Sequence, residues 1–203
     1  MNMLTYNERM KPWLEGNRPF SAAEIRKTGI PSQILVELTA NGTLEHVVRG
    51  IYLPLQTDVT ENLSLQLAAL AMPTTVVCLL SALRFHNLTT QLPQELYLAI
   101  QAHAWIPRRD AGMAVRIFTF GKEAFQFGIE EHWVDGIKIQ VYSPAKTVAD
   151  CFKFRNKIGR DIAIEALKDG WRKKLFTVDE LIAAADICRV SRVIMPYMEA
   201  ILQ

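Results

Sequence analysis

The stretch from Pro19 to Pro54, PFSAAEIRKTGIPSQILVELTANGTLEHVVRGIYLP, decides how the first part of the chain folds. Ser21 and Glu24 form the pattern S-x-x-E, in which the hydroxyl accepts from a first-turn amide and the glutamate accepts from the Ser21 amide. This pattern predicts the start of a short helix. Gly29 can adopt the positive φ of a tight helix exit, and Pro31 suits the opening of a second helix.

The second helix is followed by a predicted β-hairpin. Asn41-Gly42 is a helix-exit signal, and the segment from Leu44 to Leu53 alternates as a hairpin does, with Arg49-Gly50 at its turn. Two short helices joined by a glycine-containing turn and followed by a β-ribbon are typical of a winged helix-turn-helix. We therefore expect residues 1–57 to form a winged helix-turn-helix DNA-binding domain, with a first helix between Met1 and Leu14.

The second helix of this motif is the candidate recognition helix. Ile34, Leu35 and Leu38 recur at helical spacing and predict a buried face. On the opposite face, glutamine is suited to adenine, valine to a thymine methyl group, and the serine at the helix start to a phosphate. The candidate DNA-binding residues are Ser32, Gln33, Val36 and Ala40 on this helix, with Arg26, Lys27, His46 and Arg49 beside it.

The charge of this region argues for weak binding by a single copy. Residues 1–57 contain six basic and five acidic side chains, and the candidate recognition helix has Glu37 but no lysine or arginine. Because phosphate contacts by cations supply much of the affinity for DNA, tight binding would need two copies or a second basic surface. A motif that only binds other proteins is the alternative.

The rest of the chain, residues 58–203, predicts a larger domain of α+β class with a central, mostly antiparallel sheet and C-terminal helices. Asp135-Gly136 is a strong hairpin signal, and Thr177 with Glu180 forms a second capping box. The expected strands are 96–101, 114–120, 127–134 and 137–142, and the expected helices are 61–72, 74–86, 144–157, 161–174, 177–189 and 190–202.

A second basic surface is predicted in this domain. Between Lys146 and Lys174 there are nine cations and four acids. One interpretation is a solvated helix face on which Lys146 and Asp150 form an i, i+4 pair worth a few tenths of a kcal/mol. The other is a docking surface for DNA or for an acidic protein. The candidate residues of this basic C-terminal surface are Lys146, Lys153, Arg155, Lys157, Arg160, Lys173 and Lys174.

Composition favours a soluble cytoplasmic protein without a cofactor. The chain has 203 residues, 50% of them hydrophobic, and a net charge of +2. The three cysteines are far apart and are expected to be buried free thiols. We find no zinc pattern, signal peptide or membrane span. No common catalytic motif is present, so we expect neither an enzyme nor a metal site, and we expect His86 to end a helix with a hydrogen bond to backbone.

The pattern as a whole resembles the AbiEi family of antitoxins and transcriptional regulators. The similar segments are GIPSQIL and GTLEHVVRGIYLP in the first domain, and SALRFHNLTTQLP, LYLAI, VRIFTF and VYSPAKTVADCFKFRNKIGRDIAIEAL in the second. The segment from Val141 to Leu167 is the most distinctive, and Gln33 stands where family members often carry an arginine.

This resemblance implies a type IV toxin–antitoxin system for abortive infection, which is a defence against phage. It implies an antitoxin that represses its own operon by binding inverted repeats in double-stranded DNA. Its partner would be a nucleotidyltransferase-like toxin, countered without a stable complex being required. The resemblance also implies DNA contacts within 32–40 and 46–49, and matches the basic stretch from Lys146 to Lys174 to a positively charged C-terminal surface.

Overall fold

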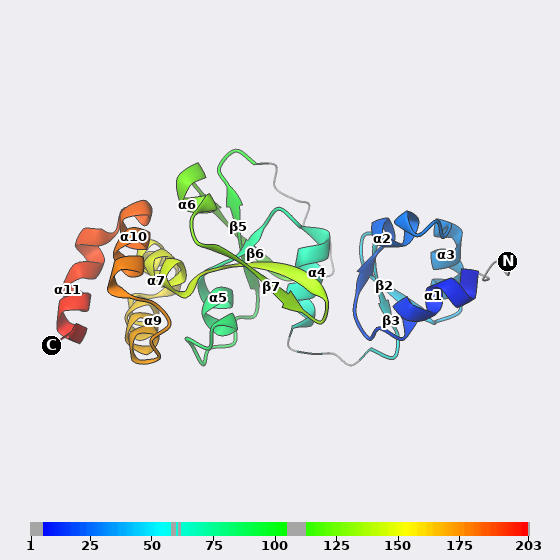
Figure 1. Ribbon diagram of the computed structural model, residues 1–203, viewed down its shortest axis with the longest axis horizontal. Helices are drawn as coiled ribbons and strands as arrows, with labels where there is room; N and C mark the ends of the chain where they lie inside the picture. The colour runs from blue at the N-terminus through cyan, green and yellow to red at the C-terminus, as the bar shows by residue number, and fades with distance from the viewer. Residues whose placement is uncertain (1–5, 58–59, 61, 105–112, 203) are drawn as a thin grey trace. The chain divides into compact units, whose positions relative to one another are not determined.

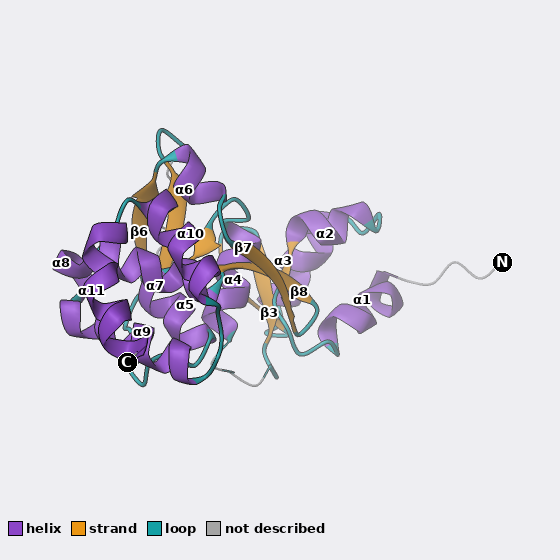
Figure 2. Cartoon of the chain, turned by 60° about the vertical axis from the view of Figure 1, so that its left-hand side comes forward, coloured by secondary structure: helices purple, strands orange, loops and turns teal. Residues whose placement is uncertain are grey.

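The computed structural model describes residues 6–57, 60, 62–104 and 113–202 of the chain. These residues form eleven helices and two β-sheets, which confirms the α+β class (Figures 1 and 2). They divide into two compact units. The first holds the described residues up to 73 together with 113 and 133–138, and the second holds the remainder.

The first unit is built from four helices and a small antiparallel sheet with the strand order β1-β3-β2. The hairpin of β2 and β3 confirms the predicted β-ribbon, and the chain reverses at Arg49 and Gly50, the glycine having a φ of 72°. The elements are α1 (Tyr6–Leu14), β1 (Phe20–Ser21), α2 (Ala22–Lys27), α3 (Ser32–Ala40), β2 (Leu44–Val48), β3 (Ile51–Pro54) and α4 (Leu63–Ala71).

The local signals of the opening stretch form as predicted. The Ser21 amide donates to Glu24 Oε2 at 2.7 Å and the Glu24 amide donates to Ser21 Oγ at 3.2 Å, which completes the capping box. Gly29 has a φ of 75°. The core beneath these elements consists of Met10, Phe20, Ile25, Ile30, Leu35 and Leu44, each at most 2% exposed.

The second sheet has the order β6-β5-β4-β8-β7, and helices α5 and α6 contact its strand β5. Helices α7, α9, α10 and α11 pack against one another (Figure 1). The elements are β4 (Val76–Val77), α5 (Leu79–Phe85), β5 (Leu96–Gln101), β6 (Val115–Phe120), α6 (Lys122–Gln126), β7 (Ile129–Val134), β8 (Ile137–Tyr142), α7 (Pro144–Lys153), α8 (Arg155–Ile158), α9 (Arg160–Arg172), α10 (Val178–Cys188) and α11 (Ser191–Leu202).

The prediction of a mostly antiparallel sheet was wrong, because the sheet is mixed. Strands β5 and β6 pair in parallel from Leu96↔Val115 to Gln101↔Phe120, and β4 pairs in parallel with β8. Parallel neighbours need a long connection, whereas a two-residue turn joins antiparallel ones. Only β7 and β8, among the strands that the structure describes in this sheet, are joined by such a turn.

Two of the predicted helices also differ from the structure, and one helix is additional. The segment expected to be one helix over 74–86 begins with strand β4, whose β-branched valines pair with Ala99 and Leu98 of β5. Helix α6 was not predicted. The helix expected over 144–157 is interrupted at Phe154, which separates α7 from α8.

Several predictions made for residues 58–203 are confirmed. Cys78, Cys151 and Cys188 are buried and free. Thr177 and Glu180 form a complete capping box at the start of α10. The turn at Asp135 and Gly136 has positive φ at both residues, 48° and 76°, as its hairpin type requires. Within the part of the chain that the structure describes, no helix combines the length and the apolar character needed to cross a membrane.

Candidate nucleic-acid interface

Helix α3 separates its side chains into a packed face and an exposed face, as its spacing predicts. Leu35 is 1% exposed, and Ile34 and Leu38 pack beside it against the core of the first unit. The exposed residues include all four candidates on this helix, and Val36 is 56% exposed. The exposed candidates are Ser32, Gln33, Val36 and Ala40.

The start of α3 leaves backbone amides available. Pro31 is its N-cap, and no side chain in the described ranges caps it. The Ile34 amide donates to the Pro31 carbonyl at 3.1 Å, so Ser32 and Gln33 carry the first-turn amides that no helical carbonyl can reach. Such amides, together with the Ser32 hydroxyl, can donate to a phosphate oxygen.

The β2–β3 hairpin carries the two other candidates in this region, and His46 has a structural role there. Its Nε2 accepts a hydrogen bond from the Gly50 amide at 3.0 Å, and its ring centroid lies 5.0 Å from that of Tyr52. These contacts hold the reversal of the chain in one conformation. Arg49 lies exposed at the turn itself, where its guanidinium is accessible to an anion.

Cations of α1 and α2 border the turn that leads into α3. Arg26 and Lys27 are exposed in the last turn of α2. Arg9 of α1, which the sequence did not single out, donates from its guanidinium to the Thr28 carbonyl. This bond ties α1 to the α2–α3 turn. Long-range contact of this kind leaves no periodic signal in the sequence, so pattern analysis could not find it.

Most of the predicted basic C-terminal surface is accessible. Its exposed members are Lys153, Lys157, Arg160, Lys173 and Lys174. Arg155 is half-buried, and its guanidinium donates to the Phe152 carbonyl at 2.8 Å.

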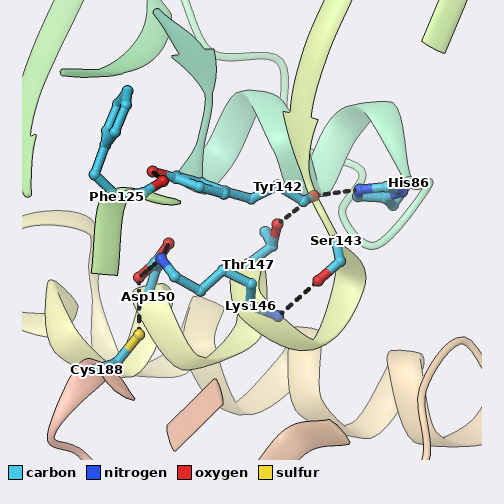
Figure 3. A network of polar contacts seen from close by, with 8 residues as sticks. All are labelled: His86, Phe125, Tyr142, Ser143, Lys146, Thr147, Asp150 and Cys188. Carbon is cyan, nitrogen blue, oxygen red and sulfur yellow. Dashed lines mark hydrogen bonds and ion pairs between the residues drawn. The ribbon is translucent and has the colours of Figure 1, made fainter. Parts of the chain in front are cut away.

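Lys146 is the exception, and its assignment to a basic surface was wrong. The residue is 0% exposed, and its Nζ lies 2.7 and 2.6 Å from Oδ1 and Oδ2 of Asp150 (Figure 3). The ammonium also lies 4.0 Å from the ring centroid of Tyr142. Helix α7 packs against α5, α9 and α10, so these elements enclose a helix face that the sequence suggested was open.

Asp150 is the centre of this buried network. It accepts from the Cys188 thiol at 3.2 Å as well as from Lys146 (Figure 3). Burial raises the pKa of Asp150, while the ammonium of Lys146 and the Cys188 hydrogen bond act in the opposite direction. Burial likewise raises the pKa of Cys188, and the Asp150 carboxylate adds to this effect. The thiol therefore remains protonated and serves as a hydrogen-bond donor.

His86 has the structural role expected of it. Its Nε2 lies 2.7 Å from the Tyr142 carbonyl oxygen, which connects the end of α5 to the end of β8 (Figure 3). Burial is the largest influence on its pKa and lowers it. This favours the neutral imidazole, with Nε2 as the donor to the carbonyl.

Comparison of the chain with family models and with curated proteins finds no match to either. The functional interpretation of α3 and the β2–β3 hairpin therefore rests on their own geometry.

Proposed function

We propose that the chain is a DNA-binding antitoxin that represses its own operon through a winged helix-turn-helix formed by α1–α3 and the β2–β3 hairpin. The observation that carries the proposal is the exposed face of α3. It projects Gln33 and Val36 away from the core and leaves first-turn amides free, which supports a role as a recognition helix.

In this proposal Gln33 and Arg49 have different tasks. A glutamine amide can donate to N7 and accept from N6 of adenine, so Gln33 would distinguish one base pair. An arginine at the tip of a β-hairpin would contact phosphate and contribute equally to all sequences. The exposed lysines and arginines of the second unit would add affinity that α3, with no cation of its own, does not supply.

The direct test is binding to the DNA upstream of this reading frame, measured by fluorescence anisotropy at several salt concentrations. Gln33→Ala should weaken binding to that DNA by about five- to a hundredfold and leave binding to scrambled DNA unchanged. Arg49→Ala should weaken both and lower the salt slope by about one. Gln126→Ala, at an exposed glutamine of α6, is the matched control and should change neither.

Two results would contradict base recognition. One is an equal loss on both DNAs from Gln33→Ala, and the other is the absence of salt-sensitive binding at micromolar protein. The second result would favour an alternative in which the exposed Val36 face of α3 binds a protein and the basic helices dock an acidic partner.

The antitoxin part of the proposal rests on the resemblance to the AbiEi family and has its own test. The reading frame next to this one should encode a nucleotidyltransferase-like protein that arrests growth when expressed alone. Co-expression of the present chain should restore growth. If growth stays arrested while the operator is bound, the chain is a repressor without antitoxin activity.

A further inference from the structure

A cavity of about 470 Å³ opens in the second unit between the end of β6, helix α6 and the end of α10. Its volume lies in the range of small-molecule sites, roughly 300–1,000 Å³. It takes residues from three segments that are far apart in the sequence, 119–124, 150–154 and 187–189. Lys153 of its lining also belongs to the basic C-terminal surface, but the proposed base and phosphate contacts of α3 and the β2–β3 hairpin do not account for the cavity.

The charge around the cavity suits an anion. Lys122, Lys153 and Arg189 line it and are exposed, whereas Glu123 is the one exposed acid among its lining residues. Asp150 also lines it, but both oxygens of that carboxylate accept from Lys146. Because the buried pair has no net charge, the cations outnumber the acids that remain.

The same cavity has an apolar wall. Phe154 and Ile187 are partly buried residues that line it, from the end of α7 and from α10. The wall also includes Phe120, the last residue of β6. A ligand that combines a flat ring with a negative group would satisfy both parts of the lining.

The end of α10 brings Arg189 to the cavity through an ordinary helix cap. This residue ends α10 with φ 59° and ψ 45°, the left-handed conformation that a helix C-terminus usually assigns to glycine. A side chain with a Cβ is disfavoured there. Two capping bonds hold this conformation: the Arg189 amide donates to the Asp186 carbonyl at 3.0 Å and the Val190 amide donates to the Ala185 carbonyl at 2.8 Å. Because the helix end itself explains this conformation, glycine suits the position, and the evidence for a ligand contact is that Arg189 is an exposed cation in the cavity lining.

We propose that this cavity binds a nucleoside monophosphate, with the phosphate on Lys122, Lys153 and Arg189 and the base against Phe154 and Ile187. The site is separate from α3, so nucleotide binding can be measured without DNA. Its outcome is independent of whether the chain is a repressor.

The experiment is isothermal titration calorimetry of the full chain with the four ribonucleoside monophosphates, with inorganic phosphate and adenosine as partial ligands. At least one monophosphate should bind more tightly than either partial ligand. Arg189→Gly should weaken that binding by about tenfold or more, since a hydrogen bond to a charged group is lost. The melting temperature of the Arg189→Gly variant without ligand should stay the same or rise, because glycine adopts the left-handed conformation of this position more readily than arginine does.

Lys174→Gly is the matched control. Lys174 is also exposed and also has a positive φ, 54°, but it does not line this cavity. It should retain the full affinity. Equal losses of affinity in the Arg189→Gly and Lys174→Gly variants would mean that general surface charge causes the effect, and would overturn the proposal. It would also be overturned if no monophosphate binds at millimolar concentration, or if inorganic phosphate binds as tightly as the nucleotide.

Discussion

Replacement of Lys146 by methionine tests whether the Lys146–Asp150 pair acts as a buried charge pair. The two side chains are 0% and 1% exposed and lie 2.6 Å apart. Methionine fills similar volume but removes the ammonium, which leaves a buried carboxylate whose remaining hydrogen-bond partner among the described residues is the Cys188 thiol. Breaking a buried pair on one side costs about 3–5 kcal/mol. We therefore expect the free energy of unfolding to fall by about that amount near neutral pH.

The pH dependence of this loss follows from the Asp150 carboxyl. Burial already raises its pKa above the ordinary value of 3.8, and removal of Lys146 takes away the largest opposing effect. The folded variant therefore binds the proton more tightly than the unfolded chain does. As pH falls through the interval between the folded and unfolded pKa values, the variant should regain stability relative to neutral pH.

Urea unfolding followed by far-UV circular dichroism near pH 7 and near pH 5 measures both effects. The double variant Lys146→Met/Asp150→Leu should recover most of the loss, because hydrophobic replacement of a whole buried pair is often neutral or stabilising. Arg172→Met is the control. Arg172 pairs with Asp169 at 3.0 Å but is 74% exposed, so its change should stay within about 0.5 kcal/mol. A loss below about 1 kcal/mol for Lys146→Met would refute the reasoning.

Three further predictions concern other parts of the chain. His86 should titrate by NMR below its ordinary pKa of 6.5, since burial lowers the pKa. The stability that depends on the neutral ring is then lost as pH falls below about 6.5. A measured pKa at the ordinary value would mean that the ring is solvated. Ser21→Ala should destabilise the first unit by about 1 kcal/mol, because it removes the capping hydroxyl. Hydrogen exchange of the α2 amides measures this loss, and unchanged protection of those amides would show that the capping box is not formed. Gly170→Ala should destabilise α9 by about 1–2 kcal/mol in urea unfolding, because the added Cβ would overlap the Phe176 ring. This loss is expected although alanine is the better helix former. Adding Phe176→Leu to that variant should restore part of the lost stability, whereas a Gly170→Ala variant more stable than the parent would contradict the packing.

Local signals in the sequence were sufficient for most elements of the fold. The capping boxes at Ser21 and Thr177, the glycine exit at Gly29 and the turn at Asp135-Gly136 each depend on hydrogen bonds or dihedral angles within a few residues. The periodicity of α3 likewise predicted which of its side chains are exposed. Such features follow from the sequence because the atoms involved are close neighbours along the chain.

Pairing between distant strands was not accessible in the same way. The parallel pairing of β5 with β6, and the assignment of Val76 and Val77 to a strand, depend on which segment each one meets in space. A short apolar run fits a buried helix or a buried strand equally well by periodicity. The partner strand decides between them by offering backbone hydrogen bonds.

Lys146 and Asp150 show most clearly which features follow from the sequence and which depend on tertiary structure. Their i, i+4 spacing determined from the sequence alone that the two charges would meet on one face of a helix. Whether the face would be open to water was decided by α5, α9 and α10, which pack around α7. Enclosure removes the solvent that would otherwise screen the charges. The pair is therefore no longer a weak surface pair, and removal of either partner strongly destabilises the folded state. Arg189 and the cavity that it lines were likewise decided by tertiary structure, because their segments meet only after folding.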